Sequence, residues 1–172
     1  MVDSDLTSLM WHERRALDDV LFAAQTLRLH LEHSGERWLE RTVDALLAAV
    51  EALRMATLER TVLSSTELDR SLRELAADTA APLGALLADH RATMRERVRE
   101  IGVERDRIVT LLAVRETAGS AAPFAGVDTV VAEPDDANVE AYVATALAER
   151  ARQRARTALT DLVPSELNDL LR

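Results

Sequence analysis

Apolar residues recur in alternating steps of four and three along the first part of the chain, and this spacing constrains the fold more than any other feature. The residues at these steps, which we call the seam positions, include one carboxylate. They are Leu6, Met10, Glu13, Leu17, Val20, Ala24, Leu27 and Leu31. A repeat of about 3.5 residues lets one face of a helix lie along a partner helix over several turns. Neighbouring apolar residues, among them Leu21 and Phe22, widen the stripe toward the face of a bundle helix. The spacing therefore predicts a long amphipathic helix within a bundle.

The composition favours helices and excludes several kinds of site. Hydrophobic residues make up 48% of the 172 residues, aromatic residues only 3%, and there are 5 glycines and 4 prolines. Helix formers therefore dominate and strand formers are scarce, so we expect an all-α fold. The absence of cysteine excludes disulfides, thiol nucleophiles and cysteine-bound metals. A formal net charge of −9 argues against nucleic acid as a partner, because phosphate binding needs an excess of cations.

Two further segments continue the helical pattern. A second helix is expected from Glu36 to about Leu63, and the short turn at Ser34 and Gly35 predicts an antiparallel hairpin with the first. A third, long helix is expected after Pro82, a residue that suits the first helical position. Residues 1–118 are thus predicted to form a helical hairpin plus a long third helix, a three-helix bundle or coiled coil.

The third helix carries the predicted partner-binding surface. At 1.5 Å per residue it would be roughly 55 Å long, longer than a compact domain of this size, so we expect part of its apolar face to be bare. This helix-three face consists of Leu87, Met94, Val98, Ile101, Ile108 and Leu112. A helix from another chain can bury such a face by knobs-into-holes packing.

The remainder of the chain is predicted to be a linker over residues 119–135 and a C-terminal helical tail over 136–172. The tail has a thin apolar stripe, which is mostly alanine after its first residues, Val139, Tyr142, Val143 and Leu147. A thin stripe buries little surface, so we expect the tail to be loosely docked. Its apolar residues are candidates for contacts with a partner.

Candidate metal and catalytic residues lack the companions that such sites need. His30 and His33 could offer two nitrogens to a metal, but no further ligands accompany them, so we expect solvated histidines. Glu13 on the apolar seam could serve as a buried acid, or it could pair with an arginine and fix helix register. We expect the pairing, with Arg14, Arg15 or an arginine of the third helix. The sequence therefore predicts no metal, no cofactor and no enzyme activity.

Arginines occupy alternate positions of the tail helix, at Arg150, Arg152, Arg154 and Arg156. Steps of two turn a helix by about 200°, so these side chains surround the helix and form no single basic stripe. We expect them in solvent, paired with Glu149 and Asp161, and not in a nucleic-acid site.

The two tryptophans are expected in different environments. Trp38 should fill the core where helices cross, whereas Trp11 lies one position off the apolar seam. An exposed aromatic residue there would anchor a partner protein.

The sequence also bears on location. The N-terminal segment carries Asp3 and Asp5 and lacks the basic start of a signal peptide. No apolar stretch approaches the roughly 18 residues that a membrane helix needs. We therefore expect a cytoplasmic protein without stable membrane insertion.

Short motifs in a fixed order connect the chain to a known family. They are WHERRAL at 11–17, LF at 21–22, LRL at 27–29, GERWL at 35–39, VEALR at 50–54, SLRELA at 71–76 and LLADHR at 86–91. This set resembles the FlgN family of flagellar export chaperones, and most of all its actinobacterial branch. The resemblance covers residues 6–118, about two thirds of the chain.

The resemblance implies a function in flagellar type III secretion. Chaperones of this family are small helical cytoplasmic proteins that bind the C-terminal helical segments of hook–filament junction proteins and deliver them to the export gate. Their C-terminal part contacts cargo and gate, and the gate contact commonly includes a tyrosine. Tyr142 is the only tyrosine of this chain.

Two alternatives remain open from the sequence. The seams could close on a second copy of the chain, which would make the protein a coiled-coil oligomerisation or scaffold protein without cargo. A helical-bundle enzyme or metal carrier is the other alternative. Whether the tail binds cargo, binds the gate or covers the empty cargo site is likewise left open.

Overall fold

The structure is a computed structural model that describes residues 2–33, 36–63, 83–120, 136–160 and 162–164. Its helices are α1 (Val2–Glu32), α2 (Glu36–Leu63), α4 (Leu83–Ser120) and α5 (Asp136–Thr160). No strand occurs among these residues, so the predicted all-α fold is confirmed. The turn at 34–35, most of the predicted linker (121–135) and the end of the tail (165–172) lie outside the described residues.

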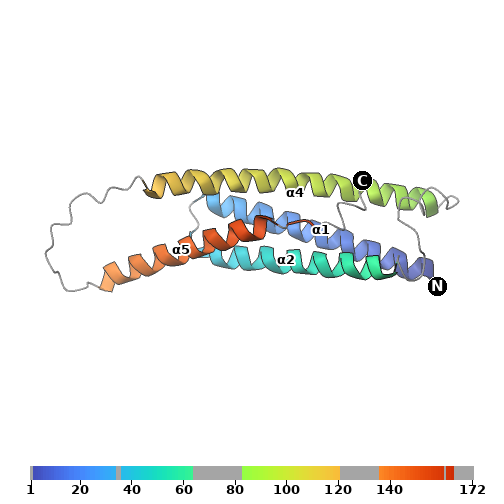
Figure 1. The fold of residues 1–172 in the computed structure, drawn as a ribbon, viewed down its shortest axis with the longest axis horizontal. Coiled ribbons are helices and arrows are strands. Elements are labelled where there is room, and N and C mark those ends of the chain that lie inside the picture. The colour runs from blue at the N-terminus through green and yellow to red at the C-terminus, as the bar shows by residue number, and fades with distance from the viewer. Residues whose placement is uncertain (1, 34–35, 64–82, 121–135, 161, 165–172) are drawn as a thin grey trace.

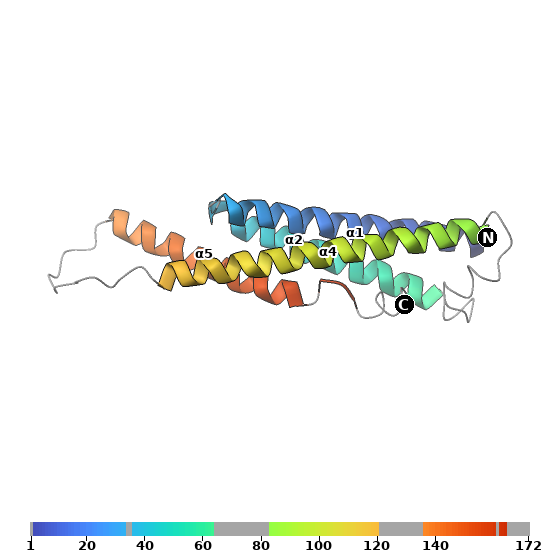
Figure 2. The same ribbon diagram turned by 90° about the horizontal axis from the view of Figure 1, so that it is seen from above.

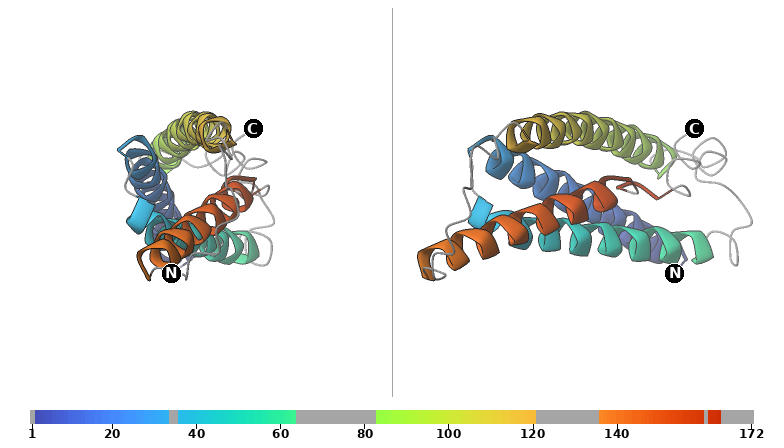
Figure 3. Two further views of the ribbon diagram at one scale, coloured as in Figure 1. Left: turned by 90° about the vertical axis from the view of Figure 1, so that its left-hand side faces the viewer. Right: turned by 60° about the vertical axis from the view of Figure 1, so that its left-hand side comes forward.

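The helices form an elongated bundle in which each helix runs opposite to the one before it (Figures 1 and 2). α1 packs against both α2 and α4, and α5 packs chiefly against α2. The predicted antiparallel hairpin of α1 and α2 is therefore confirmed, and α4 lies parallel to α1. The end view in Figure 3 shows α1, α2, α4 and α5 arranged around a common axis.

The core is built from the seam positions of three helices and the small residues of the fourth. Its largest fully buried side chains are Leu17, Leu27, Leu31, Leu39, Leu46, Leu53, Met94, Ile101, Ile108 and Leu112. These residues follow the steps of four and three that the sequence displays, because those steps return to the same face of a helix. The apolar spacing thus fixes which face of each long helix turns inward.

The prediction that the helix-three face is bare is wrong. Five of its six residues, Leu87, Met94, Ile101, Ile108 and Leu112, are at most 2% exposed, and Val98 is half-buried against the core. The reason is helix length. α1 has 31 residues and α4 has 38, so at about 1.5 Å per residue the bundle is almost as long as α4 and covers its apolar face.

The expected loose docking of the tail is also wrong for the second half of α5. Ala148, Ala151, Ala155, Ala158 and Leu159 are buried, and all but the first of them belong to the main core cluster. Small side chains let two helix axes approach closely, so an alanine stripe is a packing surface in its own right. We call these residues the alanine seam.

The first half of α5 extends past the start of α2 (Figures 1 and 2). We call residues 136–147 the α5 arm. Among the described residues, none of the helices combines the length and hydropathy that crossing a bilayer requires.

Candidate protein-binding surface

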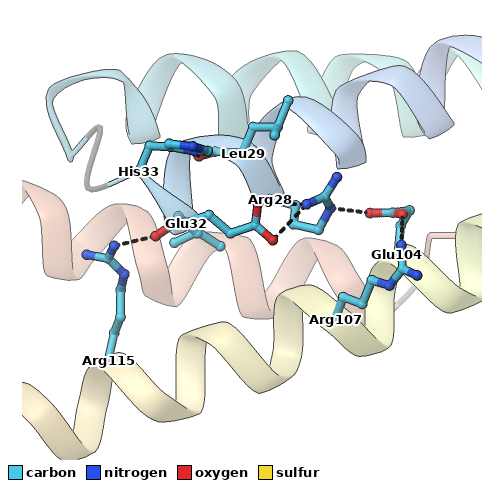
Figure 4. Close-up of polar contacts among 8 residues, drawn as sticks. Arg28, Leu29, Glu32, His33, Glu104, Arg107 and Arg115 are labelled. Carbon is cyan, nitrogen blue, oxygen red and sulfur yellow. Dashed lines mark hydrogen bonds and ion pairs between the residues drawn. The ribbon is translucent and has the colours of Figure 1, made fainter.

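Interlocking ion pairs hold the C-terminal half of α1 against α4 (Figure 4). Arg28 on α1 donates from Nε to Glu104 Oε2 at 2.8 Å and from Nη1 to Glu32 Oε1 at 2.7 Å. Arg107 donates from Nη1 to Glu104 Oε1 at 2.7 Å, so the buried Glu104 carboxylate accepts from two arginines. Arg115 donates to the carbonyl of Leu31. These contacts fix the relative register of two parallel helices.

Charges along this contact are largely neutralised by one another. Arg97 Nη1 lies 2.6 Å from Glu100 Oε2, and its Nε lies 2.7 Å from Asp18 Oδ1. The hydrogen bond with Glu100, and after it the charge of Asp18, raises the pKa of the Arg97 guanidinium. Hydrogen bonds to Glu32 and Glu104 raise the pKa of Arg28 in the same way. A ligand at this contact would therefore meet few unpaired charges.

A groove of about 580 Å³ runs along the same contact. It is lined by Asp18, Leu21, Phe22, Gln25, Arg97, Arg99, Glu100, Val103, Glu104 and Arg107. A second groove of about 570 Å³ shares Val103 and Arg107 with the first and continues to Thr110 and Leu111. We call the two together the α1–α4 groove.

Large apolar side chains in the α1–α4 groove are open to water. Phe22 is 71% exposed and Val103 is 47% exposed. Apolar surface of this kind, rimmed by polar groups, marks sites of contact with other molecules. Because two parallel helices leave a trough between them, a third helix can lie along it and bury its own apolar stripe there. The geometry therefore suits an amphipathic helix as a ligand.

The α5 arm presents a second exposed apolar surface. Tyr142 is 76% exposed, and Val143 and Leu147 are each about half exposed. These residues were predicted as tail contacts, and their exposure leaves them accessible to a partner. The side chain of Val139 lies outside the described side chains.

Glu13 pairs with an arginine, as expected, but the partner comes from α2. Arg60 Nε donates to Glu13 Oε2 at 2.7 Å, and both side chains are buried in the core. The sequence proposed an arginine of the third helix or Arg14 and Arg15, which lie on the same helix as Glu13 and follow it directly in the chain. Arg60 reaches the carboxylate because the antiparallel hairpin brings the end of α2 beside the start of α1.

His90 on α4 lies close to this ion pair. Its side chain is buried, and burial is the main cause that lowers the pKa of its imidazole to about 4, with the charges of Arg14 and Arg60 adding to the effect. The ring packs edge-on against Trp11, with ring centroids 6.5 Å apart. His90 is therefore neutral at pH 7. We call Glu13, Thr57, Arg60 and His90 the polar layer.

His33 and the tail arginines make contacts within the bundle. His33 Nδ1 lies 2.9 Å from the carbonyl oxygen of Leu29, and no cluster of three potential metal ligands occurs among the described residues. Arg152 pairs with Glu149 as expected, whereas Asp161 lies outside the described residues.

Two other tail arginines connect helices. Arg154 Nη2 lies 2.5 Å from Asp44 Oδ1 on α2, and Arg156 pairs with Glu116 on α4. The prediction that the tail arginines are simply solvated is therefore wrong for Arg154 and Arg156, because α5 lies against α2 and α4.

The tryptophans are both exposed in part. Trp11 is exposed, as one of the sequence interpretations allows, and Arg14 lies over its ring at 5.1 Å from the centroid. The expectation that Trp38 fills the core is wrong. It is 41% exposed, and Arg37 covers its ring at 5.0 Å.

The sequence did not single out the α1–α4 groove. One signal was present, because Phe22 and Leu29 are separated by seven residues and therefore share a face of α1 beside the core seam. Which helix borders that face depends on the fold.

Comparisons with protein-family models, with curated proteins and with solved structures found no match.

Proposed function

We propose that this protein is a chaperone that holds an amphipathic helix of another protein in the α1–α4 groove and serves flagellar export in the manner of the FlgN family. The observation that carries the proposal is the exposure of Phe22 and Val103 in a groove between two parallel helices. The resemblance of the sequence supports the class of cargo, the C-terminal helices of hook–filament junction proteins. The sequence predicted the cargo contact on the helix-three face, which is buried. The present proposal places it on the side of α4 that borders α1.

The apolar surface of such a groove suits a complex that forms and dissociates. At about 25 cal/mol per Å², a helix that covers about 600 Å² of apolar surface gains on the order of 15 kcal/mol before ordering costs. The loss of motional freedom on association offsets much of this gain. Paired charges at the rim, such as Arg97 with Asp18, add little to the affinity. The protein acts in the cytoplasm, by binding and without catalysis, under this proposal.

The cargo site is tested by peptide binding. A synthetic C-terminal helix of a flagellar junction protein is titrated into the full chain, and into Phe22→Ala and Leu58→Ala. Leu58 is a matched control, because it is an exposed apolar residue on α2 and does not line the groove. We expect Phe22→Ala to raise the Kd at least tenfold and Leu58→Ala to leave it within twofold. Equal affinities of the two variants, or no binding to the wild type, would overturn the proposal.

Sedimentation of the same proteins distinguishes a chaperone from the alternative, a scaffold protein that binds copies of itself. A chaperone should form a one-to-one complex with the peptide. A tight homodimer that Phe22→Ala dissociates, and that ignores the peptide, would instead identify the α1–α4 groove as a contact between copies.

Tyr142 is proposed to contact the export gate, as the resemblance implies. Its side chain is exposed on the α5 arm and does not line the α1–α4 groove. Tyr142→Ala should therefore abolish binding to a purified gate component while cargo affinity stays within twofold of the wild type. Loss of cargo affinity in this variant would place cargo on the arm instead.

A further inference from the structure

The second half of α2 carries an apolar stripe that is open to solvent. Met55, Leu58 and Val62 are each about half exposed, and steps of three and four keep them on one face of the helix. α5 packs along the first half of α2, where Arg154 pairs with Asp44, and it ends before this stripe begins (Figure 1). We call Met55, Leu58 and Val62 the α2 stripe. Exposed apolar side chains that share a helix face mark a contact surface.

A cation and an anion border the α2 stripe on opposite sides. At about 100° per residue, Arg54 lies on one flank of the stripe and Glu59 on the other, and both are exposed. Arg54 Nη1 lies 3.7 Å from Glu51 Oε2, a long contact that leaves 46% of the Arg54 side chain exposed. In coiled coils, charged residues at such flanking positions pair between helices and decide which partner and which orientation is favoured. The two flanks therefore indicate which helix the stripe fits.

The order of these two charges suits a second copy of the same helix. When two copies of α2 lie parallel with their stripes in contact, a residue on the first flank meets the residue five positions later on the other copy. Arg54 of each copy therefore meets Glu59 of the other, which gives two ion pairs related by a two-fold axis. An antiparallel pair centred on Leu58 would place Arg54 opposite Val62, so neither ion pair would form.

We propose that the α2 stripe is a contact between two copies of this chain, which lie parallel and are joined by reciprocal Arg54–Glu59 ion pairs. Glu51 lies one turn before Met55 on the same face, and the like charges of two copies would meet there, so the contact stops at Met55. The pairing leaves the α1–α4 groove open, because no residue of α2 lines that groove. It is therefore independent of the proposed function.

The small area of the α2 stripe sets the strength of the pairing. Stable dimers bury about 800 Å² of each copy, and three half-exposed side chains supply much less. We therefore expect a reversible dimer with a Kd of about 10–100 μM. In more dilute solution the chain is a monomer.

Sedimentation equilibrium of the full chain measures this pairing. The wild type should change from monomer to dimer as its concentration passes through the expected Kd. Arg54→Glu and Glu59→Arg each place like charges opposite each other, so each should raise the dimer Kd at least tenfold. An equimolar mixture of these two variants should form a heterodimer whose Kd is within threefold of the wild-type value, because every arginine of one variant then meets a glutamate of the other.

The apolar part of the contact is tested by Leu58→Glu, which should remain a monomer at every concentration. Leu86→Glu is the matched control, because Leu86 is an exposed leucine on α4. It should dimerise like the wild type, and circular dichroism checks that all variants are folded. The proposal is overturned if the wild type or the mixture stays monomeric, if either charge variant dimerises like the wild type, or if Leu58→Glu and Leu86→Glu behave alike.

Discussion

The two halves of this bundle are packed with different chemistry. Where α5 lies on α2, the buried core side chains of the described helices are mainly apolar and include Leu39, Val43 and Ala155. The buried carboxylate of this half, Glu104, pairs with the partly exposed Arg28 at the α1–α4 contact. At the other half, where α1, α2 and α4 pack without α5, the core contains the Glu13–Arg60 pair and His90. Beyond this polar layer, Met10 and Leu87 are buried but stand apart from the main core cluster.

The difference shows that burial and stabilisation are separate properties. The apolar half gains free energy from each buried side chain, at about 25 cal/mol per Å². A buried ion pair gains little relative to an apolar pair, but any arrangement that separates its members is heavily penalised. The polar half is therefore suited to select one alignment of the helices, and the apolar half to stabilise it. Four substitutions or changes of condition test this contrast.

The largest effect is expected from splitting the buried ion pair. Arg60→Met leaves the Glu13 carboxylate buried without its partner, so the free energy of unfolding should fall by about 3–5 kcal/mol. The double variant Glu13→Leu with Arg60→Met should recover most of that loss, because no buried charge remains. Urea unfolding measures both. Arg105→Ala, which breaks an exposed pair with Asp106, should change stability by less than about 0.5 kcal/mol. Additive losses in the double variant would contradict the contrast.

Acid is expected to act on the polar half through His90. The unfolded chain binds a proton at this imidazole below about pH 6.5, whereas in the folded chain its pKa is about 4. Above pH 6.5 the imidazole is neutral in both states and does not lower the free energy of unfolding. As the pH falls from 6.5 toward 4, the unfolded chain is protonated first, so the free energy of unfolding falls by about 3 kcal/mol in all. Unfolding curves of wild type and His90→Gln should converge over this range. Parallel curves for the two proteins would refute the assignment to His90.

Overpacking the alanine seam should loosen the apolar half. Ala155 is 1% exposed between α5 and its neighbours, so Ala155→Leu forces the helices apart and should cost about 1–3 kcal/mol. Limited proteolysis should then cut within α5 before the other helices. Ala144→Leu on the exposed α5 arm is the control and should change neither property. An unaltered cleavage pattern in Ala155→Leu would mean that the seam is not tightly packed.

The smallest effect is expected at Gly102 in the middle of α4. A methyl group there would meet no atom within 4 Å, and alanine has the better helix propensity. Gly102→Ala should raise the free energy of unfolding by about 1 kcal/mol, which thermal unfolding can resolve. A decrease would indicate that a bend at this residue is needed for α4 to follow α1.

Helix positions and inward faces were predictable because both depend on local spacing. The seam residues from Met10 to Leu31 and the helix starts at Glu36 and Asp136 follow from periodicity and from turn residues. The burial of the apolar face of α4 was not predictable in this way, because it depends on the length of the helices that pack against α4. The partner of Glu13 was missed for the same reason, since Arg60 is brought to it by the hairpin.

The candidate site was less accessible to sequence reasoning than the fold. Phe22 was recognised as a residue that widens the apolar stripe. Spacing alone cannot tell whether such a residue is buried against a neighbouring helix or lies exposed at the edge of the contact. The burial of the alanine seam was not predicted, because a stripe of small residues was expected to bury little surface. Their value depends on how closely two helix axes approach, which only the tertiary structure reveals.

The alanine seam has a consequence for local unfolding of the protein. α5 contributes mainly alanine methyl groups to the core and is otherwise held by exposed ion pairs such as Arg154 with Asp44, so it can detach while α1, α2 and α4 keep their large interlocked side chains. Backbone amides of α5 should accordingly exchange their hydrogens with solvent through partial openings, ahead of the amides of α1, α2 and α4. α5 would then be a reversible attachment on a persistent scaffold of α1, α2 and α4.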